Sequence, residues 1–226
     1  MSDIKFGTDG WRAIIAKDYT VNNVARVSIA VALWLKDNYD SPSVVIGHDC
    51  RFGGQLFAET AAKVLAFYKI NVKLSKGFVS TPMVSLGVVR EKADLGVVIT
   101  ASHNPPTYNG YKLKGDFGGP LLPHNISEVE SLIPSTNSID LNLLSIDDYI
   151  NQGLIDYIDL ETMYCDHVKA NFDLDLINNS EMNFAYDAMF GSGAVPRKPG
   201  LSSQCNKAVV GNNFFITFIP EPNIAS

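Results

Sequence analysis

Three side chains able to carry out nucleophilic and acid–base chemistry lie close together in the sequence: Ser102, His103 and Lys112. A serine hydroxyl becomes a nucleophile when a nearby group takes its proton and positive charge stabilises the anionic transition state. His103 could take the proton, and Lys112 could supply the charge. A Ser–His pair in a proline-rich loop is also common turn chemistry, in which both side chains bond to nearby backbone. Residue types alone leave both interpretations open.

The segment that carries these residues has the pattern of a buried strand followed by a stiff loop. Residues 95–100 form a short apolar run rich in β-branched side chains, typical of a strand covered on both faces. Two prolines in the loop at 101–106 fix φ and exclude a helix. Asn109-Gly110 is a turn signal, which predicts that the chain reverses there into a strand at 111–114. Because ligands of open α/β sheets bind beyond the carboxyl ends of strands, Ser102 is predicted to face a ligand.

The string TASHNPPTYNGYK, residues 100–112, resembles the active-site loop of the α-D-phosphohexomutases, the phosphoglucomutase and phosphomannomutase family. In that family the serine donates a phosphoryl group to a sugar phosphate and regains it from a bisphosphorylated intermediate. The resemblance implies that Ser102 is the catalytic phosphoserine and that its phosphate is a ligand of Mg²⁺. It also implies that Lys112 and His103 are catalytic groups that stabilise charge and handle protons. Asn104 is implied to order the loop and to bind substrate.

Two arginines outside this loop are further candidates. KFGTDGWR, residues 5–12, resembles the N-terminal signature of the family, and the resemblance implies that Arg12 is a catalytic residue that contacts phosphate. Asp49 and Arg51 follow a strand predicted at 43–47, where the family has an Asp-x-Arg. The resemblance implies that this pair helps to order the site, and Arg51 is also a candidate for substrate binding. The alternatives are a solvated arginine after a turn for Arg12 and a structural ion pair for Asp49 and Arg51.

Hydrophobic periodicity predicts helices and strands that alternate along the first two thirds of the chain. The predicted helices cover residues 21–36, 55–68, 81–91 and 125–132, and the predicted strands cover residues 43–47, 70–74, 95–100 and 111–114. Strands that alternate with helices indicate mainly parallel pairing through right-handed crossovers. The predicted fold is therefore a three-layer α/β/α domain with a mixed, mainly parallel sheet.

The last third of the chain is predicted to begin a second domain. Residues 147–177 carry apolar side chains at helical spacing, which predicts one long helix that links two domains. A strand is predicted at 183–187, and the glycine-containing turn after it resembles the start of the family's second domain. The predicted division is a domain at 1–146 that carries the phosphoserine loop, followed at 147–226 by the linking helix and an incomplete second α/β domain.

The resemblance stops short of a whole phosphohexomutase, which has four domains around one cleft. An Asp-x-Asp-x-Asp-Arg metal loop, a sugar-selecting loop and a phosphate-binding loop are expected later in such a protein, and none of the three occurs here. The resemblance thus implies an amino-terminal fragment. Phosphoryl transfer depends on positioning and charge stabilisation, so the fragment alone is predicted to be inactive.

For the parent enzyme the resemblance implies interconversion of hexose 1-phosphate and hexose 6-phosphate, with Mg²⁺ and an activator of the glucose 1,6-bisphosphate type. Glucose is favoured over mannose as the sugar, and TASHN in place of SASHN leans against glucosamine. A non-catalytic module that binds phosphosugars or another protein is the alternative from a different class. A serine hydrolase is disfavoured because no Gly-x-Ser-x-Gly motif surrounds Ser102.

Composition narrows the classes of partner. The 226 residues, 46% of them hydrophobic, are enough to bury a substantial core. A net charge of -6 disfavours a general nucleic-acid or acidic-membrane surface but leaves room for a local basic phosphate pocket. The three cysteines lack the spacing of a zinc site. With no apolar signal region and no segment long enough to cross a bilayer, the sequence predicts a cytoplasmic protein and leaves its oligomeric state open.

Overall fold

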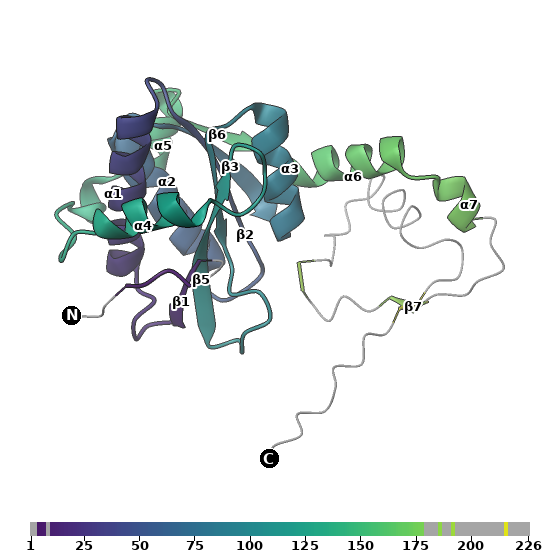
Figure 1. Cartoon of the computed structure of the whole chain (residues 1–226), viewed down its shortest axis with the longest axis horizontal. Coiled ribbons are helices and arrows are strands. Elements are labelled where there is room, and N and C mark those ends of the chain that lie inside the picture. Colours follow the sequence, from purple (N-terminus) through teal and green to yellow (C-terminus); the bar gives the residue numbers. More distant parts are fainter. Residues whose placement is uncertain (1–3, 8–9, 179–184, 187–190, 193–214, 217–226) are drawn as a thin grey trace, which may run out of the picture. The chain divides into compact units, whose positions relative to one another are not determined.

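The computed structural model describes residues 4–7, 10–178, 185–186, 191–192 and 215–216, drawn as ribbon in Figure 1. The chain divides into two compact units, Met1–Met163 and Tyr164–Ser226. The first unit contains a six-stranded sheet, in the order β1-β5-β4-β2-β3-β6. The second contains a parallel pair of short strands, β7 and β8.

The elements alternate much as the hydrophobic pattern predicts. The strands of the sheet are β1 (Trp11–Ile14), β2 (Ser43–His48), β3 (Asn71–Phe78), β4 (Leu95–Ile99), β5 (Tyr108–Gly115) and β6 (Ile155–Ile158). The α-helices are α1 (Val21–Asn38), α2 (Gly54–Phe67), α3 (Thr81–Glu91), α4 (Pro123–Ser131), α5 (Ile146–Asn151), α6 (Leu160–Asn171) and α7 (Leu174–Asn178), with a 3₁₀ turn η1 at Leu141–Leu143. The short pair is β7 (Ala185–Tyr186) and β8 (Phe215–Ile216).

The sheet is mixed. Strands β4, β2, β3 and β6 run parallel to one another, while β5 is antiparallel to both β4 and β1. Helix α2 connects β2 to β3 and helix α3 connects β3 to β4, because parallel strands cannot be joined by a short hairpin. The predicted three-layer α/β/α fold with a mixed, mainly parallel sheet is confirmed.

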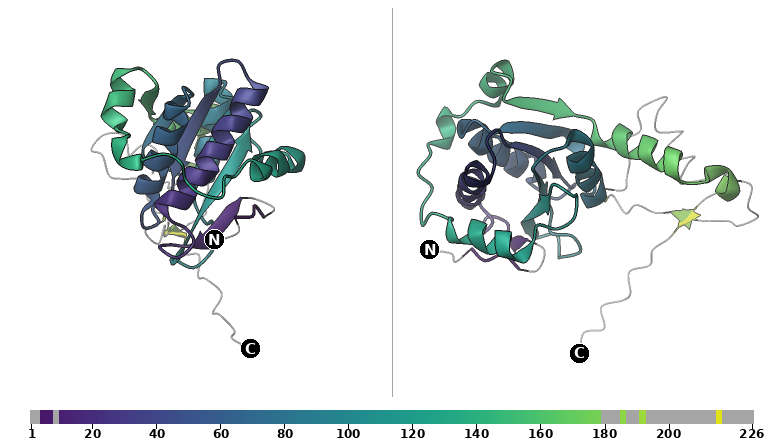
Figure 2. Two further views of the ribbon diagram at one scale, coloured as in Figure 1. Left: turned by 90° about the vertical axis from the view of Figure 1, so that its left-hand side faces the viewer. Right: turned by 45° about the horizontal axis from the view of Figure 1, so that its top comes forward.

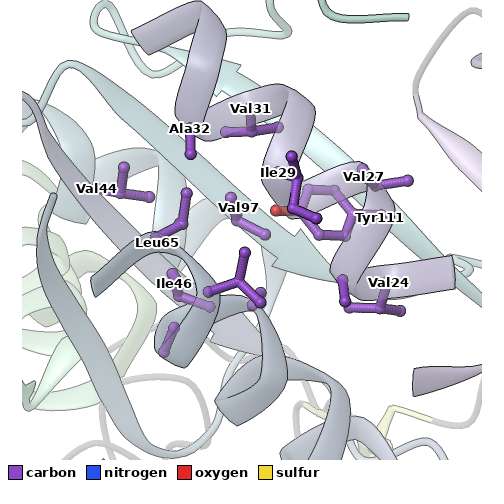
Figure 3. Packing of buried hydrophobic residues seen from close by; sticks show 14 of the residues in the cluster. Val24, Val27, Ile29, Val31, Ala32, Val44, Ile46, Leu65, Val97 and Tyr111 are labelled. Atoms are coloured by element: carbon purple, nitrogen blue, oxygen red, sulfur yellow. The ribbon is translucent and has the colours of Figure 1, made fainter. Parts of the chain in front are cut away.

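The main core lies between the sheet and the layer formed by α1 and α2 (Figure 2). On α1, Val24, Val27 and Val31 recur at helical spacing and are fully buried. They pack with residues of the sheet that include Ile46, Val97 and Tyr111, as Figure 3 shows. A second cluster, which contains Val45, Val84, Val98 and Leu160, joins the other face of the sheet to α3 and the start of α6. Helices on both faces keep β4 fully buried, as its apolar run predicts.

The prediction of one long helix at 147–177 is wrong. The segment forms α5, β6, α6 and α7 instead. Gly153, with φ of 70°, follows the end of α5 in a left-handed conformation that suits glycine. The next residues pair with β3 as an edge strand, and Ile155 becomes fully buried. Burial of this strand against the sheet favours β structure here more strongly than the helical spacing of the apolar residues on either side favours a helix.

The prediction of a turn at Asn109-Gly110 is also wrong, because both residues lie inside β5. Gly110 is needed there for close packing. A Cβ atom on it would lie 2.6 Å from the Thr100 carbonyl oxygen and 2.8 Å from the Trp11 carbonyl oxygen. The dipeptide thus marks a close approach of backbones within the sheet, and the chain reverses earlier, in the loop after β4.

Few of the predictions for the last third of the chain can be compared with the structure. Strand β7 lies within the range predicted at 183–187, and the rest of that range lies outside the described residues. In the part of the chain that the structure describes, no helix has the length and apolar character needed to span a membrane.

Candidate functional site

The loop between β4 and β5 presents Ser102 to solvent. Ala101 is fully buried at its base, whereas Ser102 and His103 are exposed. Ser102 has φ of 57°, in the left-handed region that residues other than glycine enter rarely. The loop is closed by two backbone turns, in which the Asn104 N–H donates to the Ala101 carbonyl at 3.1 Å and the Tyr108 N–H donates to the Pro105 carbonyl at 3.0 Å. A strained serine on an ordered loop is a typical feature of an active site.

Ser102 and His103 are adjacent in space as well as in sequence. The Ser102 Oγ atom lies 3.4 Å from His103 Nδ1, at the long end of the hydrogen-bond range. A general base must lie within hydrogen-bonding reach of the proton it accepts, and such contacts are often long before substrate binds. The imidazole is therefore placed to exchange a proton with the serine oxygen.

The Arg12 side chain reaches the same loop from β1. Strand β1 pairs with β5 so that Arg12 lies opposite Gly110. From there the Arg12 Nη1 atom donates a hydrogen bond to the Asn104 side-chain carbonyl at 2.9 Å. The structure thus brings Arg12 and Asn104 together beside Ser102.

Lys112 lies on β5, opposite Val98 of β4, and its side chain is 4% exposed. It packs next to Gly10, where a Cβ atom would lie 3.0 Å from Lys112 Cγ. Lys112 therefore lies buried within the sheet, whereas Ser102 and His103 are exposed on the loop.

Arg51 is placed beneath the loop rather than at its surface. Its Nη1 atom donates to the carbonyl oxygens of Pro105 and Tyr108, at 2.8 and 3.0 Å. Its Nη2 atom donates to the carbonyl oxygens of Ser102 and Asn104, at 2.8 and 2.6 Å. One guanidinium therefore holds four backbone carbonyls of the serine loop.

Asp49 and Thr100 connect Arg51 to the nucleophile. The Asp49 Oδ1 atom accepts the Arg51 backbone N–H at 3.0 Å, and Oδ2 lies 3.4 Å from Arg51 Nε. The same Oδ2 accepts the Thr100 hydroxyl at 2.5 Å. The Thr100 oxygen in turn accepts the Ser102 N–H at 3.0 Å. Thr100 was not predicted as a site residue, although it is the first residue of the string that carries the family resemblance.

Tyr19 is a second residue that sequence reasoning did not find. It is fully buried, stacks on Trp11 with ring centroids 4.7 Å apart, and donates its hydroxyl to the Gly110 carbonyl at 2.8 Å. Burial raises the pKa of Tyr19 well above its usual value, and Tyr111 and Asp49 add to that increase. The Tyr19 phenol therefore stays neutral and supports the strand that follows the serine loop.

The residues around Ser102 do not by themselves fit a complete magnesium site. Mg²⁺ prefers six oxygen ligands in octahedral geometry. Among the described residues, no group of three or more His, Cys, Asp or Glu side chains could hold a metal ion. The nearby carboxylate, Asp49, is engaged by Arg51 and Thr100. A phosphate on Ser102 would supply one ligand, and the described residues supply no cluster of acidic ligands beside it.

Comparison with known proteins gives a consistent set of relatives. Residues 3–140 match the family model described as phosphoglucomutase/phosphomannomutase, alpha/beta/alpha domain I. A phosphoglucomutase from Staphylococcus haemolyticus is 32% identical over 91% of this chain and 38% of its own length. A phosphoglucosamine mutase from Alkaliphilus oremlandii is 32% identical over 91% of this chain and 44% of its own length.

Solved structures agree. A protein from Thermus thermophilus, assigned as a phosphomannomutase, superposes with a TM-score of 0.79 at 32% identity, covering 95% of this chain and 45% of its own. The Paramecium phosphoglucomutase parafusin, at 17% identity and a TM-score of 0.70, covers 91% of this chain and 40% of its own and shares the fold. The chain spans less than half the length of each of these relatives.

Proposed function

The chain belongs to the phosphoglucomutase/phosphomannomutase family, and from this we propose that Ser102 carries the phosphoryl group of a phosphohexomutase reaction. The observation that supports this most directly is the geometry of Ser102. Its hydroxyl is exposed, its backbone is left-handed, and its loop is held by Arg12, through Asn104, and by Arg51. This arrangement fixes a hydroxyl at the carboxyl end of a buried strand, where α/β sheets bind ligands.

In the proposed reaction, phosphorylated Ser102 meets a hexose monophosphate. The bond between phosphorus and Ser102 Oγ breaks as a sugar hydroxyl oxygen forms a bond to phosphorus, which gives a hexose bisphosphate. The hydroxyl proton passes to Ser102 Oγ, with His103 as the relay. The other phosphoryl group then passes from its sugar oxygen to Ser102 Oγ, and the Ser102 proton returns to that sugar oxygen. This regenerates the phosphoserine and leaves the isomeric monophosphate. Arg12 and Lys112 stabilise the charge of the transferring group.

The proposal covers the hexose phosphates as a class. Relatives named phosphoglucomutase and phosphoglucosamine mutase match this chain at the same 32% identity, so the comparison favours no single sugar. Glucose phosphates are the first to test. Mg²⁺ bound partly by phospho-Ser102, and an activator of the glucose 1,6-bisphosphate type, are parts of the same proposal. When bound, Mg²⁺ would neutralise charge on the phosphoryl group.

Labelling of Ser102 tests the proposed function. The natural protein that carries this chain is incubated with isotopically labelled glucose 1,6-bisphosphate, and the site of labelling is located by mass spectrometry. We expect label on Ser102, and none in Ser102→Ala. A protein that binds the bisphosphate with Ser102 unlabelled would instead be a phosphosugar-binding module, and the proposed mutase function would be wrong.

We also propose that residues 1–226 alone have little or no mutase turnover, because the described part of them provides no cluster of acidic metal ligands. Interconversion of glucose 1-phosphate and glucose 6-phosphate by the purified 226-residue chain, measured with and without Mg²⁺, checks this. Sustained turnover would contradict it.

A further inference from the structure

The backbone of Ser102 is held on both sides, by the side chains of Thr100 and Arg51. Its N–H donates to Thr100 Oγ1, and its carbonyl oxygen accepts from Arg51 Nη2. We propose that Asp49, Arg51 and Thr100 form a clamp that positions Ser102 for phosphoryl transfer, and that Arg51 is a positioning residue rather than a ligand of substrate. The catalytic consequence rests on the proposed function, whereas the clamp itself can be tested without it.

In this geometry every N–H donor of Arg51 already faces an acceptor of the protein, which leaves none to bind a substrate. A guanidinium has five N–H donors in a fixed plane and no acceptor. Four of them point to the carbonyls of Ser102, Asn104, Pro105 and Tyr108, and the Nε donor faces Asp49 Oδ2 at 3.4 Å. A sugar phosphate could bind Arg51 only by displacing bonds that hold the loop. The same donors would be unsatisfied if the loop moved away, so Arg51 and the loop stabilise each other.

Asp49 determines which groups donate and which accept in the hydrogen bonds that connect it to Thr100 and Ser102. Its carboxylate is acceptor-only, so the Thr100 hydroxyl must donate its single hydrogen to Asp49 Oδ2. That leaves the Thr100 oxygen as the acceptor for the Ser102 N–H. The Asp49 and Arg51 side chains are only 13% and 12% exposed, and Thr100 is 4% exposed. Charged hydrogen bonds are stronger in such a partly buried setting than at an open surface.

The clamp stabilises the left-handed backbone conformation of Ser102, which is unfavourable without it. A left-handed backbone is unfavourable for a residue other than glycine, and Ser102 has φ of 57°. Bonds at both its N–H and its carbonyl oppose relaxation of that strain. Misplacement of a reacting group by about 1 Å can cost on the order of 100-fold in rate. Loss of the clamp is therefore expected to slow phosphoryl transfer more than it weakens binding.

Amide exchange in the 226-residue chain tests the clamp directly. Thr100→Val keeps the shape of Thr100 but removes its hydroxyl, whereas Thr100→Ser keeps the hydroxyl. We expect exchange at the Ser102 amide to rise by about tenfold or more in Thr100→Val, the factor that corresponds to one lost hydrogen bond, and to change by less than about threefold in Thr100→Ser. Equal exchange in the two variants would overturn the clamp.

Steady-state kinetics of the natural protein test the role of Arg51. Arg51→Lys keeps the charge but cannot bond four carbonyls. A positioning role predicts a fall in kcat of roughly 100-fold with KM for glucose 1-phosphate changed by less than about threefold. A rise in KM with kcat unchanged would show instead that Arg51 binds substrate. Arg51→Lys could fail to fold, which thermal unfolding would reveal. In that case a lower kcat in Thr100→Val than in Thr100→Ser would support the positioning role of the clamp, and equal kcat values would overturn it.

The two hypotheses fail separately. If the wild-type protein is never labelled at Ser102, the proposed mutase function is wrong, while the exchange experiment still decides whether the clamp exists. If Ser102 is labelled equally fast in Thr100→Val and in wild type, the mutase function stands and the positioning role is wrong.

Discussion

Arg12 and Asn104, separated by 92 positions in the sequence, are joined by a 2.9 Å hydrogen bond from Nη1 of the arginine to Oδ1 of the amide. The bond exists because β1 pairs antiparallel with β5 and so carries Arg12 to the base of the serine loop. The two arginines of the site differ in how their donors are used. Among the described residues, Arg51 donates to four loop carbonyls and Arg12 to one loop side chain. Arg12 is therefore the better placed of the two to bind a phosphate.

Removal of Arg12 is predicted to weaken catalysis through its contact with phosphate. In Arg12→Ala we expect kcat/KM for glucose 1-phosphate to fall by roughly 10- to 150-fold, the equivalent of one charge-assisted hydrogen bond of about 1.5–3 kcal/mol. Arg12→Lys keeps the charge and should lose less. Asn104→Ala should lose part of the same effect. The fold-decrease in kcat/KM of the double variant should therefore be smaller than the product of the fold-decreases of the two single variants. An Arg12→Ala protein with unchanged kcat/KM would contradict this role.

Gly110→Ala is predicted to destabilise the fold. The added Cβ would lie 2.6 and 2.8 Å from two backbone carbonyl oxygens, of Thr100 and Trp11, and backbone atoms of a sheet cannot move aside easily. We expect the free energy of unfolding, measured by urea denaturation, to fall by about 2–4 kcal/mol, at or above the usual cost of overpacking. Gly77→Ala is the matched control, because its Cβ would meet no atom within 4 Å. Equal effects at the two positions would show that crowding is not the cause.

The sequence predicted best those elements whose pattern agrees with their burial. The apolar stripe of α1 and the continuous run of β4 leave little choice of structure, and both formed close to the predicted bounds. The segment at 147–177 failed because its helical spacing spans separate elements, and the partner that makes β6 a strand is β3, far away in the sequence. Pairing across such a distance leaves no local signal.

The residues of the site likewise differ in how well the sequence predicted them. Ser102, His103 and Asn104 are contiguous, so one local string was enough to select them. An ordering role for Asp49 and Arg51 was expected from the sequence, but the partners of Arg51 could not be identified, because they are carbonyl groups that every residue carries. Thr100 was hidden for a related reason. Its hydroxyl acts on a backbone N–H two residues later, and a threonine at a strand end is ordinary in itself.

Stability is predicted to fall at alkaline pH because of the buried tyrosines. Burial raises the pKa of both Tyr19 and Tyr111 above the usual value near 10. The folded state then keeps protons that the unfolded state releases, so each tyrosine's contribution is complete below about pH 10 and is lost as pH rises above it, at up to about 1.4 kcal/mol per pH unit.

Urea unfolding of wild type and Tyr111→Phe between about pH 9 and pH 11 checks this. The variant loses the 3.2 Å contact between the Tyr111 and Ser28 hydroxyls and should be less stable at neutral pH. Its stability should nevertheless decline less steeply with rising pH. Tyr157→Phe is the control, since Tyr157 is 47% exposed and should change the slope less. Parallel slopes for wild type and Tyr111→Phe would contradict the prediction.

The strain at Ser102 can be measured by comparing glycine with alanine. Both variants remove the hydroxyl, so the difference between them reports the backbone alone, and glycine accepts φ of 57° where alanine does not. We expect Ser102→Gly to be more stable than Ser102→Ala by about 1 kcal/mol, and neither to be labelled by glucose 1,6-bisphosphate. The same pair at the exposed helical residue Ser127 of α4 should show the reverse order by a similar amount, since glycine weakens a helix by about 1 kcal/mol relative to alanine. If alanine were the more stable at both positions, the strain would be absent, and the clamp would have no strained backbone to hold.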